Sequence, residues 1–142
     1  MNQRRNDEKG SALVMVLGVL AAIAITVVTT EKKTAFAEYT NSRSFYSADA
    51  ASEAGVNWIH RQSSPPMLVD TLSHVFKAAS YATLRDDNRY QYDVTFTRKR
   101  FRPGWSVEFK DYEYTVDARG ASSQESEAAV QVTATRLYRE GY

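Results

Sequence analysis

The stretch GSALVMVLGVLAAIAITVVTT, residues 10–30, decides the fold of this chain. It holds 21 residues, and no charged residue lies between Lys9 and Glu31. As an α-helix it would extend about 30 Å, which is the thickness of the hydrocarbon core of a bilayer. In lipid only a helix or a closed barrel satisfies its own backbone groups, so this stretch predicts a transmembrane helix over residues 11–30.

The charges on either side of the apolar stretch predict its orientation. The ten residues up to Gly10 carry three basic and two acidic side chains, a net charge of +1. The positive-inside rule then predicts a single pass with a cytoplasmic N-terminus, although Lys32 and Lys33 on the other side oppose this bias. Two other interpretations of the stretch remain open. It could be a secretory signal peptide cleaved near Ala21-Ala22, or a plain single-pass anchor.

The composition of the whole chain excludes several classes of protein. The chain has 142 residues, a net charge of +1 and no cysteine, and its mean hydropathy is −0.48. These values exclude collagen-like, disordered and multi-span membrane proteins, and a nucleic-acid binder that acts through bulk charge. Without cysteine there is no disulfide framework and no thiol nucleophile.

The helical pattern continues beyond the apolar stretch. Between Glu31 and Gln62 there is no proline, and the only glycine is Gly55. A row of mostly small residues recurs there at steps of three and four, which is the spacing of one helix face. The members of this predicted helix–sheet packing stripe are Phe45, Ala48, Ser52, Gly55 and Ile59. Pro65-Pro66 ends the pattern, so we expect one helix over about residues 11–62 with an amphipathic half at 31–62.

Residues 63–142 are expected to form a globular part outside the membrane. A short helix or irregular segment is predicted for residues 67–85, and the apolar period then changes to two, as in half-buried strands. We expect three or four antiparallel strands, and the alternating segments are 90–96, 105–109, 112–118 and 130–137. One face of this small sheet would pack on the long helix, which gives an α+β fold.

No set of residues predicts catalysis, a metal site or a cofactor. His60 and His74 are the only histidines and lack any metal-ligand spacing. The serines have no G-x-S-x-G context, and there is no glycine-rich phosphate loop. We therefore expect a protein that is not an enzyme.

One basic cluster has two interpretations. Arg98, Lys99, Arg100 and Arg102 are interleaved with aromatic residues, a pattern that can bind single-stranded nucleic acid. The alternative is a strand end whose charges resist edge pairing or meet an acidic neighbouring subunit. Nearby acidic residues dilute the local charge and favour the second interpretation.

Three parts of the N-terminal tract resemble PilX-family minor pilins of type IV pili. A short charged leader ends in Lys9-Gly10, and Ser11-Ala12-Leu13-Val14 opens the apolar helix. The tract FYSADAASEAGVNW, which contains residues 48–55, is similar to the family's FYAAEAGL-type signature. The resemblance covers roughly residues 8–60 and implies a pilin-like fold, with a long N-terminal helix on a small antiparallel sheet.

The resemblance implies a prepilin signal. A prepilin peptidase would cut between Gly10 and Ser11, so that Lys9, Gly10 and Ser11 form the processing site and residues 1–10 the leader. Removal of the leader leaves 132 residues, with 15 basic and 15 acidic side chains. The apolar helix stays on the mature protein, unlike that of an ordinary signal peptide.

Met15 occupies the place of a residue that pilins usually have as glutamate, the fifth of the mature chain. A carboxylate within a membrane costs about 2.5–3.5 kcal/mol or more and needs a partner. In the family picture that partner is the N-terminal ammonium of the subunit above. A subunit with Met15 cannot form this pair but can still offer its own ammonium below. The resemblance therefore implies a position at or near the fibre tip.

The resemblance also implies a function, partners and a location. The function would be to prime pilus assembly with other minor pilins, and further partners would be the major pilin, a tip adhesin and the peptidase. The chain would cross the inner membrane once before assembly and then lie in the fibre on the cell surface. It lacks the C-terminal disulfide loop of many pilins. A GspK-like minor pseudopilin of type II secretion and a single-pass membrane-anchored interaction module remain alternatives.

Overall fold

The computed structural model describes residues 2–122 and 126–140, and the side chains of residues 15–85, 87–122 and 126–140. The chain divides into two compact units, of which the first ends at Tyr39 and the second begins at Thr40. The first unit is helical over all of its described residues, 2–39. The second unit contains the end of the same helix and an antiparallel sheet.

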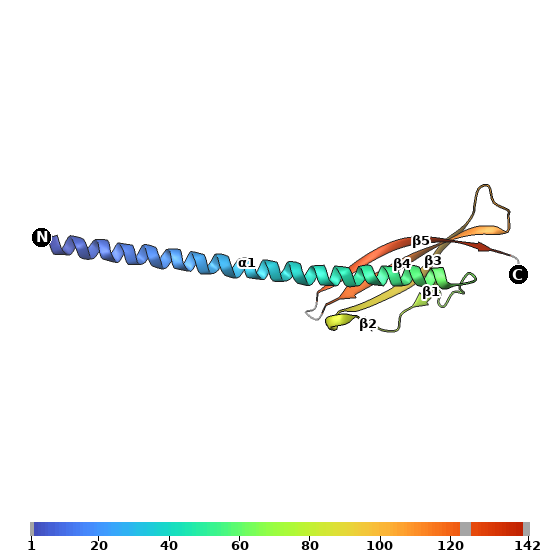
Figure 1. The fold of residues 1–142 in the computed structure, drawn as a ribbon, viewed down its shortest axis with the longest axis horizontal. Coiled ribbons are helices and arrows are strands. Elements are labelled where there is room, and N and C mark those ends of the chain that lie inside the picture. Colours follow the sequence, from blue (N-terminus) through green and yellow to red (C-terminus); the bar gives the residue numbers. More distant parts are fainter. Residues whose placement is uncertain (1, 123–125, 141–142) are drawn as a thin grey trace. The chain divides into compact units, whose positions relative to one another are not determined.

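The helix, α1 (Asn2–Arg61), is 60 residues long (Figure 1). The prediction of one long helix is confirmed, but its expected start at Ser11 is wrong, because α1 already begins at Asn2. The earlier residues include glutamine, arginine, glutamate and lysine, which extend a helix at little cost, and a single glycine at Gly10 does not end it.

The C-terminal end of α1 is capped by side chains. The Gln62 side-chain amide donates a hydrogen bond to the Trp58 carbonyl at 3.1 Å, and the Arg136 guanidinium donates to the Ile59 carbonyl. The last carbonyls of a helix have no partner within the helix and carry partial negative charge, so a cation at this end stabilises it. Pro65-Pro66 follows in the chain and cannot continue the helix.

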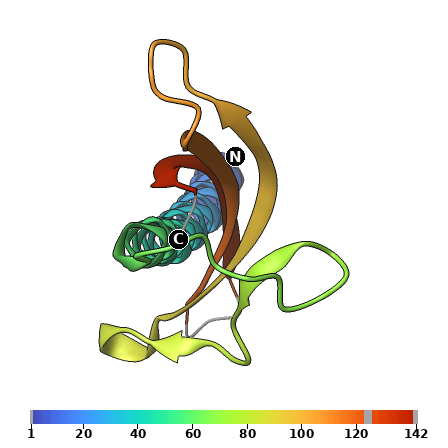
Figure 2. The same ribbon diagram turned by 90° about the vertical axis from the view of Figure 1, so that its right-hand side faces the viewer.

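Five strands form one antiparallel sheet with the order β1-β3-β4-β5, and β2 pairs separately with β3. The strands are β1 (His74–Lys77), β2 (Ala82–Thr83), β3 (Arg89–Phe101), β4 (Phe109–Ala121) and β5 (Glu127–Arg139). A short 3-10 helix, η1 (Arg85–Asp87), precedes β3. In Figure 2, the part of α1 from Thr40 onward lies against one face of the sheet.

Two predicted elements of the sheet domain need correction. The segment 67–85 has no α-helix: it is irregular over most of its length, which agrees with one of the two predictions for it, but it also contains β1, β2 and the start of η1. Residues 105–108 are not a strand but the end of the β3–β4 connection, in which Gly104 has a φ of 79° and Trp105 N–H donates to the Arg102 carbonyl at 3.2 Å. The tight turn takes up the residues that alternation alone assigns to a strand. The sheet thus has five strands rather than three or four.

A β-bulge at Thr97 reverses the alternation of β3. Phe96 pairs with Tyr114, whereas Arg98 pairs with Glu113, so one residue of β3 has no partner on β4. Before the bulge the even-numbered residues of β3 share a face with the even-numbered residues of β4. After it the odd-numbered residues do so, because an extra residue turns the following side chains to the other face.

The second half of α1 contacts the sheet through small residues. The buried positions of this half recur at steps of three and four, and they are Thr40, Ser44, Ser47, Ala48, Ala51, Ser52, Gly55 and Ile59. The predicted stripe is therefore confirmed at four of its five positions. Phe45 is wrong: it is 55% exposed, since the position one turn before Ala48 on this face is Ser44.

Two glycines allow the helix and the sheet to approach closely. A Cβ atom on Gly120 of β4 would lie 2.2 Å from the Ala48 nitrogen and 2.3 Å from the Ser44 carbonyl oxygen of α1. A Cβ atom on Gly55 would lie 2.4 Å from a methyl group of Val116. Only glycine fits at these two contacts between α1 and β4.

The core of the second unit lies between α1 and the sheet. Its fully or nearly fully buried residues are Ile59, Val75, Val94, Tyr114, Val116 and Tyr138. Around them, aromatic rings extend the packing, with Phe76 stacked on Tyr92 at 4.9 Å and Phe96 edge-on to Tyr114 at 5.9 Å. Tyr92 and Tyr114 therefore serve packing, as aromatic pairs usually do in sheets.

Candidate functional site

A long apolar surface is exposed on the first half of α1. Every described side chain from Met15 to Tyr39 is exposed. The large apolar ones among the first fourteen of these residues are Met15, Val16, Leu17, Val19, Leu20, Ile23, Ile25, Val27 and Val28. Among the described residues, one helix is long and apolar enough to cross a membrane. An apolar surface of this size marks contact with lipid or with another protein.

The polar side chains within this apolar surface bond to the helix itself. The hydroxyl of Thr26 donates to the Ala22 carbonyl at 2.8 Å, and that of Thr30 donates to the Thr26 carbonyl at 2.9 Å. Thr29 bonds in the same way to carbonyls one turn earlier. A hydroxyl that is already bonded enters hydrocarbon at lower cost than a free one, so these threonines are compatible with a lipid or protein environment.

The predicted processing residues Lys9, Gly10 and Ser11 lie within α1, and their side chains are outside the described residues. Met15 is the first residue whose side chain is described, and it is 71% exposed. An exposed thioether at this position is compatible with lipid because methionine is apolar and flexible.

Three of the four predicted basic residues form ion pairs on the sheet face opposite α1. Glu113, whose side chain is largely buried, accepts from Arg98 at 3.0 Å and from Arg100 at 2.8 Å. Arg102 lies 3.8 Å from an Asp111 oxygen. These acidic partners are on β4, directly across from β3. The pairs compensate the local positive charge and favour a strand-end role over nucleic-acid binding.

Lys99, the fourth basic residue, lies on the other face because of the Thr97 bulge. Its ammonium lies 2.6 Å from Glu140, which also accepts from Lys110 and, at 2.5 Å, from the Tyr112 hydroxyl. Hydrogen bonds from Lys110, Lys99 and Tyr112 lower the pKa of Glu140 from its ordinary 4.5 to about 2. Burial and the bond to Glu140 raise the pKa of Tyr112 to about 12. This cluster ties the end of β5 to β3 and β4.

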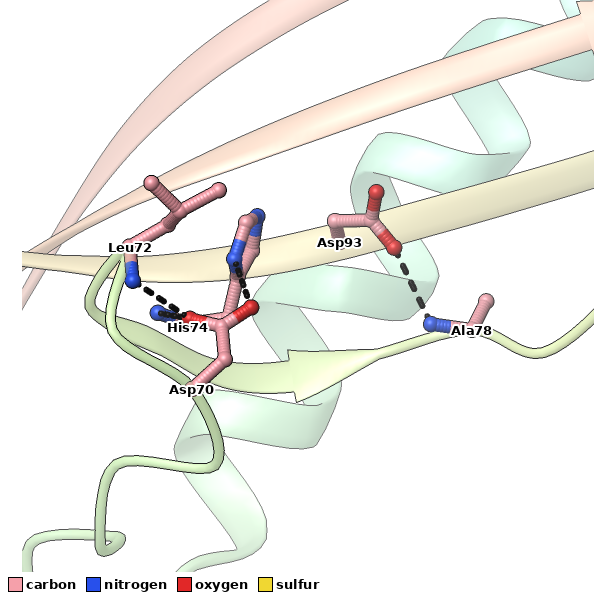
Figure 3. A network of polar contacts seen from close by, with 5 residues as sticks. All are labelled: Asp70, Leu72, His74, Ala78 and Asp93. Atoms are coloured by element: carbon pink, nitrogen blue, oxygen red, sulfur yellow. Dashed lines mark hydrogen bonds and ion pairs between the residues drawn. The ribbon is translucent and has the colours of Figure 1, made fainter.

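A polar turn before β1 brings Asp70 next to His74, one of the two histidines of the chain (Figure 3). Asp70 accepts from the Leu72 and His74 N–H groups at 2.9 and 3.1 Å and contacts His74 Nδ1 at 2.6 Å. Against the effect of desolvation, these bonds lower the pKa of Asp70. Asp93 accepts from the Ala78 N–H at 3.0 Å. These groups fix the chain around β1 and give the turn a structural role.

The histidines do not meet in a metal site within the described part of the chain. There, no group of three or more histidine, cysteine, aspartate or glutamate side chains could hold a metal ion. His60 lies in the last turn of α1, and His74 bonds to Asp70.

Two residues that matter for the packed half of α1 were not singled out in the sequence. Gly120 allows the close approach of β4, and Arg136 of β5 caps the helix. The sequence does contain a signal for Gly120: Val116, Ala118 and Gly120 decrease in size along one face of β4, which indicates a place where another element can come close. Arg136 has none, because it lies 77 residues from its partner.

Comparisons with family models, curated proteins and solved structures gave no match.

Proposed function

We propose that this chain is a minor pilin of a type IV pilus, which primes fibre assembly and lies at or near the fibre tip. The observation that carries the proposal is the exposure of every described side chain from Met15 to Tyr39 on a helix whose next residues pack on a sheet. Such a helix suits a subunit that is held in a membrane first and packs against other subunits afterwards.

The proposed life of the protein has two stages. Residues 11–30 first cross the inner membrane with the N-terminus in the cytoplasm, where a prepilin peptidase cuts between Gly10 and Ser11. The apolar half of α1 then leaves the lipid and enters the fibre core beside other minor pilins and the major pilin. In both stages its side chains face an apolar environment, so the transfer costs little.

The tip position follows from the chemistry of Met15. A thioether needs no ionic partner in hydrocarbon, whereas a carboxylate there costs about 2.5–3.5 kcal/mol unless it is paired. The ammonium at Ser11 remains available to a carboxylate of the subunit added below. The chain can thus stand first in the fibre, under a tip adhesin, without an unpaired buried charge.

Met15→Glu tests this proposal in a strain that carries the pilus genes and lacks the native copy of this chain. We expect the wild-type chain to restore surface fibres and immunogold to label their tips. Met15→Glu should place the protein along the fibre, and Met15→Leu, as the matched control, should keep it at the tip. Tip-only labelling of Met15→Glu with unchanged fibre numbers would contradict the role of Met15. Unchanged piliation without the chain would contradict the function.

A single-pass membrane-anchored interaction module is the second candidate. It is favoured by the continuity of α1 through Gly10 and Ser11, because an uncut anchor would have this form. The two candidates differ in the mature N-terminus: the module keeps residues 1–10, and the pilin loses them.

A further inference from the structure

The sheet ends on one side in a long unprotected strand. Among the described residues β5 pairs only with β4, over all of its 13 residues and without a bulge. Residues 128–135 contain no charge, proline or glycine. Natural sheets usually blunt such an edge with these features, because it is a template for pairing with another strand.

The direction of the main-chain groups of β5 follows from two hydrogen bonds at the ends of its ladder. Ser122 N–H donates to the Ser126 carbonyl at 2.9 Å, and Glu140 N–H donates to the Glu108 carbonyl at 2.7 Å. Both pairs continue the β4–β5 register. In an antiparallel ladder hydrogen-bonded pairs alternate with pairs that are not hydrogen-bonded. The even-numbered residues of β5 therefore bond to β4, and the odd-numbered ones point their N–H and C=O groups outward.

Four uncharged residues in the middle of β5 present these outward groups: Ala129, Gln131, Thr133 and Thr135. Within residues 2–122 and 126–140, no other element gives them a backbone hydrogen bond. Their side chains are exposed on the face opposite α1. Because strands carry their donors and acceptors at this spacing, the free edge is complementary to an extended main chain.

The opposite margin of the sheet is protected. β1 and β2 have only four and two residues, and the β1–β3 register shifts between His74 and Phe76. Beyond β1, the last part of β3 carries Arg98, Lys99 and Arg100. Short strands, irregular pairing and charge all discourage strand addition. Over residues 128–135 the β5 margin has none of these features and is therefore the one open to an added strand.

We propose that β5 binds an extended segment of another protein as an added strand of the sheet. The even-numbered residues Ala128, Val130, Val132 and Ala134 face the α1 side and are only half-buried. An added strand with apolar side chains at alternate positions would cover this row and continue the apolar layer over α1. The partner segment therefore alternates small apolar with polar residues and carries little charge.

The partner is a different protein rather than a second copy. A symmetric pair of β5 edges from two copies would run antiparallel. From Thr40 to Arg61, α1 lies along the strands (Figure 1), so the two helices would then point in opposite directions. Two such copies could not share one membrane, and this step rests on the proposed membrane anchor.

Hydrogen exchange of the full chain in detergent micelles tests the proposal. The probe is a synthetic peptide of alternating threonine and valine with a lysine at each end. We expect saturating peptide to slow the exchange of the Ala129, Gln131, Thr133 and Thr135 amides by about tenfold or more. Protection confined to other strands, or none at millimolar peptide, would overturn the proposal. Protection that rises with protein concentration without peptide would identify a second copy as the occupant and also overturn it.

Thr133→Pro tests the edge itself, because it removes one outward N–H and leaves the bonds to β4 intact. It should abolish the protection by peptide, and the matched control Thr133→Ala, which keeps the N–H, should not. If Thr133→Pro unfolds, Thr133→Lys with Thr135→Lys replaces it, and these charges should weaken peptide binding about tenfold. Undiminished binding by a folded variant would overturn the proposal. N-terminal processing does not affect this assay, so its failure is distinguishable from failure of the proposed function.

Discussion

The two halves of α1 share one backbone conformation but have opposite surroundings. From Thr40 onward the buried side consists of threonine, serine, alanine and glycine and ends in Ile59, and the sheet comes close to the helix backbone. From Met15 to Tyr39 every described side chain is exposed, and those up to Val28 are mostly large and apolar. A stripe of small residues allows the second half of the helix to pack on the sheet of its own chain. Large apolar residues on all sides of the first half require contact with lipid or with another protein.

The largest expected effect comes from charging the exposed half. Leu20→Lys together with Ile23→Lys should cost about 5–7 kcal/mol of membrane insertion, because each lysine costs about 2.5–3.5 kcal/mol at the centre of a span. The measurement is the share of the protein that stays in membranes after a carbonate wash. Tyr46→Lys, at an exposed position in the packed half, is the control and should stay in the membrane. Full retention of the double variant would show that the two halves do not differ in this way.

The next largest effect is expected from disrupting the contact between the second half of α1 and the sheet. Gly120→Ala should lower the free energy of unfolding of the sheet domain by about 3 kcal/mol, because its Cβ would meet helix backbone that cannot rotate away. Urea unfolding of the full chain in detergent, followed by tryptophan fluorescence, measures it. Gly18→Ala is the control, since nothing lies within 4 Å of the added Cβ. A Gly120→Ala variant as stable as the control would contradict the close approach.

A pH effect should be confined to the sheet domain. The pKa of Glu140 is about 2 in the fold against an ordinary 4.5, so its contribution to stability is complete above pH 4.5. That contribution is lost as the pH falls toward 2. Wild type should therefore melt at a higher temperature than Glu140→Gln at pH 6, and the difference should shrink as the pH approaches 2. A difference in Tm that stays constant over this range would contradict the cluster around Glu140.

The smallest expected effect tests whether Phe45 belongs to the helix–sheet packing stripe. Phe45→Ala should change the free energy of unfolding by less than about 0.5 kcal/mol, because the ring is mostly exposed. Ile59→Ala, at a fully buried position of the same helix, should cost about 2–5 kcal/mol. Chemical denaturation of the two variants side by side checks the pair. Equal losses would restore Phe45 to the stripe.

The sequence predicted the helix and the strands that are long enough to show a repeating pattern of apolar residues. The apolar stretch and the helical period predicted the long helix, and alternation predicted most of β3, β4 and β5. β1 and β2, with four and two residues, are too short to show a period. The choice of Ser44 over Phe45 depends on the space between helix and sheet, which hydrophobicity alone does not reveal.

Prediction from the sequence failed where the structure depends on contacts between distant residues or on one extra residue in a strand. The Thr97 bulge leaves no compositional mark, yet it decides that Lys99, rather than Arg98 and Arg100, lies on the α1 side of the sheet. The acidic partner of Lys99 lies 41 residues away. The basic cluster was therefore found in the sequence, but the ion pairs that compensate its charge were not.

The N-terminus of the mature protein tests the central claim most directly. Expressed with a prepilin peptidase and purified from membranes, the chain should begin at Ser11 by N-terminal sequencing, with the mass of the 132 residues that remain of 142. Without the peptidase it should begin at Met1. A chain that begins at Met1 in the presence of an active peptidase, or at a residue beyond 20, would contradict the account.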